Sequence, residues 1–104
     1  MKKWITTGIH CDLFTTAVRT SDNGMFGLSL LLIEKEMKGV ICRKIKTQGY
    51  ETSSTSFIIF ENVKVPVKNL IGNEDEGFKY IMTNFNHERL SMCMYGLRSL
   101  RLSI

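Results

Sequence analysis

Three cysteines and two histidines are the side chains that could hold a metal ion or act as nucleophile and base: Cys11, Cys42, Cys93, His10 and His87. Zinc sites and disulfide frameworks need such residues at close or paired spacings. Only His10 and Cys11 are neighbours, the cysteines are odd in number, and there is no Cys-x-x-Cys pair. We therefore expect reduced thiols and no metal site. No glycine-rich phosphate loop and no Ser-His-Asp arrangement is visible either.

The composition is typical of one ordinary globular domain, with 104 residues of which 43% are hydrophobic and 23% charged. The longest apolar run, residues 28–33, is much shorter than the roughly 20 residues that span a bilayer. Polar residues at positions 6, 7, 10 and 12 interrupt the apolar stretch that a signal peptide would need. We expect an intracellular protein without a membrane span. The sequence does not choose among mitochondrion, peroxisome and cytoplasm.

The formal net charge of +4 at pH 7 is a mild excess that favours anionic partners. The lysines and arginines are scattered, however, and are not grouped with aromatic residues on which bases could stack. We therefore expect no nucleic-acid binding. A stand-alone β-module that binds a polyanion or a protein partner is kept as an alternative function, and salt-dependent binding would reveal it.

Alternating, β-branched segments predict about five strands and no helix before residue 70. The expected strands are residues 13–20, 28–34, 40–46 and 57–65, with a further strand or strand end at residues 3–7. Ser-Asp-Asn-Gly at residues 21–24 forms turns readily, so we expect a β-hairpin with a rather long loop. Pro66 donates no backbone hydrogen bond and fits the end of the strand before it.

The spacing of apolar residues changes to three and four after the glycine at position 72, which predicts one long helix. Its apolar positions are Phe78, Ile81, Met82, Phe85, Cys93, Leu97, Leu100 and Ile104. Asp75 is the expected N-cap, and Glu74 and Glu76 would complement the helix dipole. The pattern continues to the last residue without a C-cap signal, so we expect the helix to be truncated.

Four motifs follow one another at residues 3–8, 60–66, 69–72 and 77–79. Lys-Trp-Ile-Thr-Thr-Gly at residues 3–8 is similar to the Lys-x-Trp-Ile-Thr-Asn-Gly strand of the acyl-CoA dehydrogenase family, and Phe-Glu-Asn-Val-Lys-Val-Pro at 60–66 is similar to its Phe-Glu-Asp-Val-x-Val-Pro strand. Asn-Leu-Ile-Gly at 69–72 and Gly-Phe-Lys at 77–79 resemble its Asn-x-(Leu/Ile)-Gly and Gly-Phe loop. Their order makes the resemblance specific over about residues 2–95.

The resemblance implies a mainly β fold. Residues 1–72 would be part of the family's middle domain, an antiparallel β-barrel or sandwich that is incomplete here, and residues 73–104 would be the truncated first helix of its C-terminal helical domain. The family removes the α-proton of an acyl-CoA thioester with a carboxylate and passes the β-hydrogen to FAD as hydride. Such an oxidoreductase of fatty acid metabolism would be a homo-oligomer, with an electron-transferring flavoprotein or oxygen as acceptor.

The resemblance also assigns residues to FAD and to the substrate. Trp4, Ile5 and Thr6 match the strand that lies along the flavin, with the indole beside the ring and the hydroxyl near N5. Ser53 matches a residue that approaches acyl-CoA in a Gly-x-Arg-x-Ser-x-Thr segment. Glu51 stands where the family usually has arginine, which puts the contacts of CoA at this edge in doubt.

Asn86, His87 and Arg89 match helix positions that face the CoA chain and the acyl pocket. Glu88 matches the position where the isovaleryl-type and long-chain-type branches place the catalytic base. A glutamate beside an apolar pocket would be made more basic by desolvation, as removal of an α-proton requires. The alternative is that Glu88 and Arg89 are a solvated or salt-bridging pair on the helix surface, and most other branches draw their base from a later segment.

Large parts of the family's enzyme have no counterpart in this sequence. They include the N-terminal helical domain, the first strands of the middle domain and nearly all of the C-terminal helical domain. We therefore expect this chain by itself to bind FAD weakly or not at all and not to turn over acyl-CoA. A non-catalytic remnant of a dehydrogenase is a further alternative.

Overall fold

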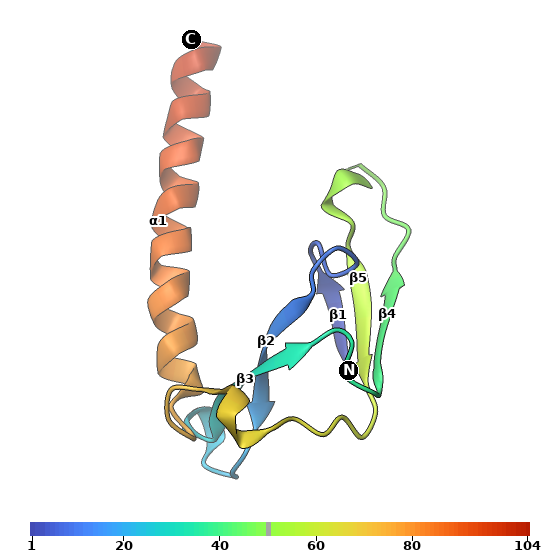
Figure 1. Cartoon of the computed structure of the whole chain (residues 1–104). Coiled ribbons are helices and arrows are strands. Elements are labelled where there is room, and N and C mark those ends of the chain that lie inside the picture. Colours follow the sequence, from blue (N-terminus) through green and yellow to red (C-terminus); the bar gives the residue numbers. More distant parts are fainter. Residues whose placement is uncertain (50) are drawn as a thin grey trace.

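The computed structural model describes residues 1–49 and 51–104. The strands in this part of the chain are β1 (Lys2–Ile5), β2 (Leu13–Arg19), β3 (Leu28–Glu34), β4 (Val40–Lys44), β5 (Ser56–Phe60) and β6 (Leu70–Ile71). The 3-10 turns are η1 (Gly24–Phe26), η2 (Glu51–Ser53) and η3 (Val67–Asn69), and one α-helix, α1 (Gly77–Ser103), follows them. The prediction of a mainly β fold followed by one long helix is confirmed (Figure 1).

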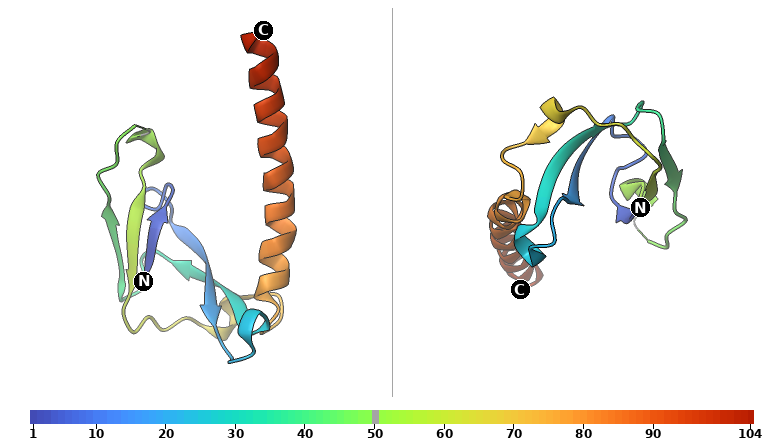
Figure 2. Two further views of the ribbon diagram at one scale, coloured as in Figure 1. Left: turned by 180° about the vertical axis from the view of Figure 1, so that it is seen from behind. Right: turned by 90° about the horizontal axis from the view of Figure 1, so that it is seen from below.

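The strands form two small antiparallel sheets. One has the order β1-β5-β4 and the other the order β2-β3-β6. The β2–β3 hairpin pairs without interruption from Leu13 opposite Glu34 to Arg19 opposite Leu28, as the alternating sequence predicts. Figure 2 shows the two sheets from two further sides, with α1 beside β3. The sheets do not close into a barrel, which agrees with the prediction of an incomplete β-domain.

A small core holds the two sheets together. Phe14 of β2, Ile33 of β3 and Ile58 of β5 are its buried members, and Ile58 is only 2% exposed. The rings of Phe14 and Phe60 meet edge to face, with their centroids 6.5 Å apart. Each of these side chains contributes about 1.5–3 kcal/mol by burial. These contacts fix the position of the sheet that carries β1 relative to the β2–β3 hairpin.

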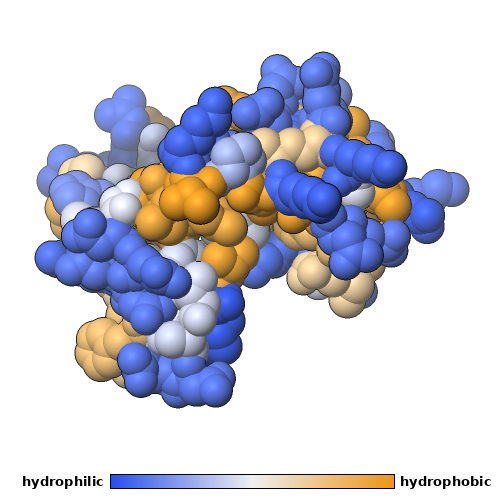
Figure 3. Space-filling model, turned by 60° about the horizontal axis from the view of Figure 1, so that its bottom comes forward, coloured by the Kyte–Doolittle hydropathy of each residue, from blue (hydrophilic) through white to orange (hydrophobic). Residues whose placement is uncertain are grey.

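The molecule is more open than a compact domain of its length. Its radius of gyration is 16.6 Å, whereas about 13 Å is expected for a compact chain of this size. A cavity of about 280 Å³ lies between β1 and β2 and is lined by core residues such as Phe14 and Ile58. Hydrophobic side chains also reach the surface in Figure 3. The β-domain therefore exposes part of what would be its interior.

The strand predicted for residues 57–65 is shorter than expected, because β5 ends at Phe60. The Glu61 amide donates to the Gly39 carbonyl at 2.9 Å, and Asn62 then takes a positive φ of 50°. A left-handed residue turns the chain out of the sheet. Val63 and Val65 still pack against the core from outside the strand.

The prediction that Asp75 is the N-cap of the helix is wrong. The helix begins at Gly77, and its N-cap is Glu76, which makes no side-chain capping hydrogen bond. Asp75 has a φ of 63° and lies outside the helix. Its carboxylate accepts hydrogen bonds from the β2–β3 loop instead of from the helix amides. Tertiary contacts decide its role here, and they are not readable from the local sequence.

Helix α1 contacts the rest of the chain near its first turns. It packs on β3 and on η1, and then rises away from the sheets in Figure 1. Beyond this base its apolar side chains are exposed, such as Leu90 at 61% and Leu102 at 76%. No helix among residues 1–49 and 51–104 is long and apolar enough to cross a membrane.

Candidate functional site

Strand β1 carries an extra residue at Trp4. Lys3 pairs with Phe57 and Ile5 with Ser56, so Trp4 has no partner of its own on β5. Its φ is 66°, which is rare for a bulky side chain. This is a β-bulge, a feature that re-aims side chains and is frequent beside active sites. The bulge turns the indole of Trp4 away from the regular ladder.

The bulge leaves the side chains of Trp4 and Thr6 accessible. Trp4 is 62% exposed, so it is not a core aromatic residue. The Lys3 ammonium nitrogen lies 5.2 Å from the ring centroid, which favours a cation–π contact with the indole. The Thr6 side chain is exposed, and its hydroxyl has no hydrogen-bond partner among residues 1–49 and 51–104. The aromatic face of Trp4 and the hydroxyl of Thr6 are therefore both accessible at the end of β1.

The chain after β1 is tied to the segment around η2. The Thr7 amide donates to the Ser53 carbonyl at 2.8 Å, and Thr7 has a positive φ of 59°. The Ser56 hydroxyl, which is fully buried, donates to the Ile5 carbonyl at 3.0 Å. The Ser53 hydroxyl lies 2.9 Å from that of Thr55. The structure thus brings Ser53 beside the segment that follows Trp4–Thr6; Tyr50, in the same segment as Ser53, lies outside the described residues.

His10 and Ser54 form a second link between the same two segments. His10 Nε2 lies 2.9 Å from Ser54 Oγ, and Ser54 is only 7% exposed. Ser54 also has a φ of 46°. Left-handed residues other than glycine cost free energy and tend to gather at functional sites. Here Trp4, Thr7 and Ser54 lie in two adjoining segments, a grouping that the sequence did not signal.

A close approach at Gly8 keeps these segments together. A Cβ at Gly8 would lie 2.0 Å from Ser56 Oγ and 3.3 Å from Ile58 Cδ1, so only glycine fits without movement of the neighbours. Gly8 is itself buried. The resemblance marks this glycine only as the last position of the Trp-Ile-Thr motif. The structure gives it a packing role.

The other predicted site residues lie together on α1. Asn86, His87, Glu88 and Arg89 are all exposed. Glu88 Oε1 accepts from the Asn84 side chain at 2.7 Å, and His87 Nδ1 lies 3.0 Å from the Thr83 carbonyl. Both are i to i+4 contacts within the helix. Within the part of the chain that the structure describes, Glu88 is exposed and has a polar neighbour beside it, not an apolar pocket.

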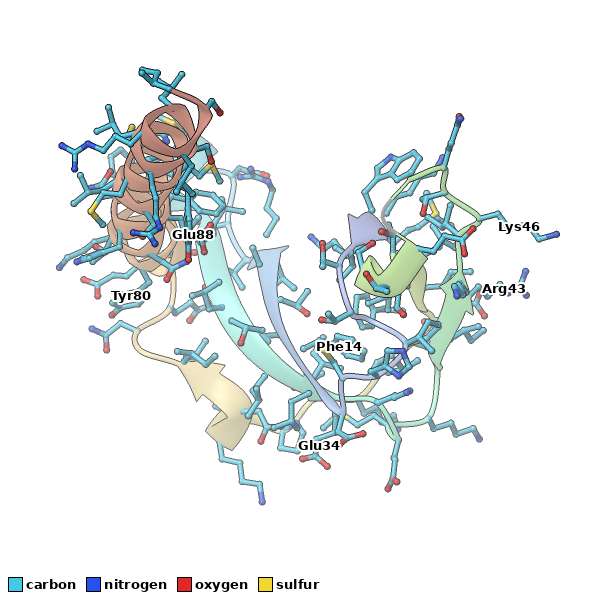
Figure 4. The ribbon with its side chains drawn as sticks, turned by 90° about the horizontal axis from the view of Figure 1, so that it is seen from above. Phe14, Glu34, Arg43, Lys46, Tyr80 and Glu88 are labelled. Carbon is cyan, nitrogen blue, oxygen red and sulfur yellow. The ribbon has the colours of Figure 1, made fainter. Side chains whose placement is uncertain are left out.

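The two groups of predicted residues come from different parts of the molecule. Trp4 and Ile5 lie on β1 of the sheet β1-β5-β4, Thr6 follows that strand and Ser53 lies in η2, whereas α1 packs on β3 of the other sheet. Figure 4 looks down from above and shows Glu88 on one side of the molecule and Arg43 of β4 on the other. The chain therefore presents two separate surfaces instead of one closed pocket.

Shifted pKa values occur at the base of α1. Hydrogen bonds from the Thr20 hydroxyl and then from Ser21 lower the pKa of the Asp75 carboxyl. Hydrogen bonds from the Tyr80 hydroxyl and then from the Asn73 side chain lower the pKa of Glu76. Both groups therefore hold their negative charge to a lower pH than ordinary carboxylates. Their donors are structural neighbours in the helix base.

The three cysteines are free thiols. Cys11 and Cys42 are half-buried against the core, and Cys93 is exposed on α1. Cys11 Sγ lies 3.2 Å from the Thr7 hydroxyl. Among residues 1–49 and 51–104, no group of three His, Cys, Asp or Glu side chains is close enough to hold a metal ion.

Comparison with known proteins connects this arrangement to one family. No family model matches the chain. An acyl-CoA dehydrogenase of Emericella nidulans is 48% identical over 104 residues, which are 99% of this chain and 24% of that protein. The crystal structure of a probable acyl-CoA dehydrogenase from Mycobacterium abscessus superposes with a TM-score of 0.82 and 43% identity, over 86% of this chain and 24% of that one.

A second similar structure is described as an electron transferring flavoprotein of Acidaminococcus fermentans. It has a TM-score of 0.74 and 40% identity, over 78% of this chain and 22% of that chain. The fold thus matches the middle domain of acyl-CoA dehydrogenases, followed by one long helix. This chain belongs to the acyl-CoA dehydrogenase family and spans about a quarter of the length of the relatives it matches.

Proposed function

We propose that this chain supplies part of the active site of an FAD-dependent acyl-CoA dehydrogenase, which introduces an α,β double bond into an acyl-CoA thioester. The observation that carries the proposal is the match of nearly the whole chain to such enzymes, at 48% identity over 99% of it. The bulge at Trp4 adds support, because it exposes a strand end whose residue types suit a flavin.

The residues present at this strand end fit FAD. The exposed indole of Trp4 offers a large flat surface beside which an aromatic ring can pack. The Thr6 hydroxyl can both donate and accept a hydrogen bond, which suits a ring nitrogen whose protonation changes on reduction. Ile5, half-buried between them, fixes the strand against Ser56. When bound, FAD would supply the acceptor for the substrate's β-hydrogen.

Substrate contacts are proposed for the η2 segment and for α1. Ser53 would approach the acyl-CoA from the sheet, and Asn86, His87 and Arg89 would face it from the helix. Glu88 would be the base that removes the α-proton. Its exposure in this chain means that an apolar pocket would have to come from elements outside it, since burial is what raises a carboxyl's basicity.

Two further properties of the parent enzyme are proposals. An electron-transferring flavoprotein or oxygen would reoxidise the flavin, and the similar structure described as an electron transferring flavoprotein supports the first of these. The parent enzyme would be a homo-oligomer. Fatty acid metabolism is the setting we expect for it.

The chain by itself should bind FAD weakly or not at all. Its flavin-facing strand end lies at an open surface, and the α1 residues are not brought beside it. A purified 104-residue chain that carries bound flavin would contradict this expectation. Absence of flavin would agree equally with the alternative of a non-catalytic remnant, so a second experiment is needed.

A chimera separates these alternatives. The matching quarter of the Emericella nidulans relative is replaced by residues 1–104, and bleaching of the flavin absorbance is followed after an acyl-CoA is added. If residues 1–104 are part of an active enzyme, the chimera should bind FAD and appear yellow, and the acyl-CoA should bleach its flavin absorbance. Glu88→Gln should slow bleaching by about 10²-fold or more, because a general base contributes about that much.

Glu74→Gln is the matched control. Glu74 is also an exposed glutamate, but it precedes the helix, so its substitution should leave the bleaching rate unchanged. Bleaching that is equally fast with Glu88→Gln would exclude Glu88 as the base while leaving the flavin assignment intact. A chimera that loads FAD but is never bleached would favour the remnant.

A further inference from the structure

The base of α1 contains a closed ring of hydrogen bonds. The Asp75 amide donates to the Ser29 hydroxyl at 2.8 Å, Ser29 and Thr20 share a hydrogen bond of 2.7 Å, and Thr20 donates to Asp75 Oδ1 at 2.6 Å. The Ser21 hydroxyl donates to Asp75 Oδ2 at 2.8 Å. The ring therefore joins Asp75, which precedes α1, to the β2–β3 loop and to β3.

The direction of each hydrogen bond in the ring is determined. A carboxylate only accepts, so the single hydroxyl proton of Thr20 goes to Asp75. Thr20 must then accept from Ser29, which itself accepts from the Asp75 amide. Thr20 and Ser29 each use their donor and one acceptor position, and Ser29 is fully buried. Loss of the Thr20 hydroxyl leaves the buried Ser29 hydroxyl without its acceptor, which costs free energy.

Backbone contacts make the same joint rigid. A Cβ at Gly77 would lie 2.8 Å from the Leu28 carbonyl oxygen and 2.8 Å from the Ser29 carbonyl carbon. Glu76 forms an isolated parallel bridge with Leu28. The first residue of α1 therefore lies directly on the backbone of β3. The ring of hydrogen bonds beside it holds the turn at Asp75, where φ is 63°.

A small tilt of α1 at its base, where Asp75 and Gly77 contact the β2–β3 hairpin, would move the distant part of the helix by a larger distance. Glu88 is 12 positions after Glu76, which places it about 18 Å along the helix axis. A tilt of about 10° at the base would move it by about 3 Å at that radius. A misplacement of even about 1 Å can cost an enzyme about 10²-fold in rate. Beyond its base, the helix is exposed along the part that carries Asn86–Arg89.

We infer that Asp75 is a positioning residue, whose ring with Thr20, Ser21 and Ser29 sets the direction in which α1 leaves the β-domain. Through this joint, the β2–β3 hairpin determines where Asn86–Arg89 lie relative to Trp4–Thr6. The part of the inference that concerns these two groups rests on the proposed function. The geometric part does not, because it concerns only the direction of the helix.

Spin labels on the full chain measure this direction without any flavin. One label goes on Cys93, an exposed native cysteine of α1, and the other on Arg43→Cys, exposed on β4. Cys11→Ser and Cys42→Ala remove the other thiols. The distribution of distances between the two labels, measured by double electron–electron resonance, reports how firmly the helix is held.

Thr20→Val keeps the side-chain shape and removes the hydroxyl, whereas Thr20→Ser keeps the hydroxyl. We expect a narrow distribution for the unchanged ring and for Thr20→Ser, and broadening of about twofold or more for Thr20→Val and for Asp75→Asn. Asp22→Asn, an exposed carboxyl in the same loop, is the control and should change nothing.

Equal widths for Thr20→Val, Asp75→Asn and the unchanged chain would overturn the inference. So would a broad distribution in the unchanged chain, since the ring would then fail to hold the helix. A broadening by Thr20→Val that Thr20→Ser does not share supports it, whatever the result of the chimera experiment.

Discussion

The two groups of proposed site residues are built in different ways. Trp4–Thr6 and Ser53 are held by contacts between segments about fifty positions apart, such as Thr7 with Ser53 and Ser56 with Ile5. Asn86–Arg89 are held by the helix alone, through contacts such as Asn84 with Glu88. Contacts between distant segments fix the arrangement of the first group within the β-domain. The helix fixes the arrangement of the second group, and by our inference the hydrogen bonds of Asp75 fix its position relative to the β-domain.

This difference predicts that the two regions contribute unequally to the free energy of unfolding. Substitutions in the β-domain should lower the free energy of unfolding, because the core and the buried hydroxyls are there. The same substitutions on α1 should have small effects, because its side chains face solvent. Three pairs of matched variants test this contrast and a fourth tests the base of α1, and urea unfolding followed by circular dichroism measures each of them.

The largest contrast is expected between Ile58→Ala and Leu97→Ala. Ile58 is 2% exposed in the core, so its truncation should cost about 2–5 kcal/mol. Leu97 is 62% exposed on α1, so the same truncation should change stability by less than about 0.5 kcal/mol. Equal losses would mean that the exposed face of α1 is buried in solution.

The next contrast uses one substitution at two glycines. Gly8→Ala would push a methyl group to 2.0 Å from Ser56 Oγ and should cost about 1–3 kcal/mol. Gly96→Ala meets nothing within 4 Å on the helix and should stabilise by up to about 1 kcal/mol. A neutral Gly8→Ala would show that β1 and β5 can separate at little cost.

The two histidines provide a smaller contrast. His10→Ala leaves the buried Ser54 hydroxyl without its 2.9 Å partner and should cost about 1–2 kcal/mol. His87→Ala removes an exposed side chain from the helix and should change stability by less than about 0.5 kcal/mol. If His87→Ala proves the more damaging, the link between the β1–β2 turn and η2 is unimportant.

The smallest effect is a pH dependence at the helix base. Folding lowers the pKa of Asp75 and of Glu76, so the stability they contribute is fully present above the pKa of the unfolded chain. It is lost as pH falls below about 4, through the lower pKa of the folded state. Asp75→Asn should reduce this acid dependence, and Asp22→Asn should not; identical pH profiles for both would argue against the hydrogen-bonded ring.

Periodicity and motif order predicted most of the fold. The strand at residues 28–34 matches β3, and the spacing after Phe78 gave the helix. What could not be predicted depends on contacts between distant segments. The bulge at Trp4, the end of β5 at Phe60 and the carboxylate ring of Asp75 each arise from a partner in another element. The local sequence predicted Asp75 as an N-cap. This prediction was wrong because the hydrogen-bond donors of Asp75, Thr20 and Ser21, are far from it in sequence.

The central claim is that Trp4–Thr6 form part of a flavin site, and the flavin content of the chimera tests it most directly. The ratio of bound FAD to protein is measured for the chimera, for Trp4→Ala and for Tyr95→Ala, which removes another exposed aromatic side chain. We predict flavin in the chimera and in Tyr95→Ala, and a loss of about tenfold or more in the affinity of Trp4→Ala for FAD, since aromatic stacking and burial contribute a few kcal/mol. A folded chimera without FAD, or Trp4→Ala with unchanged affinity, would contradict the claim.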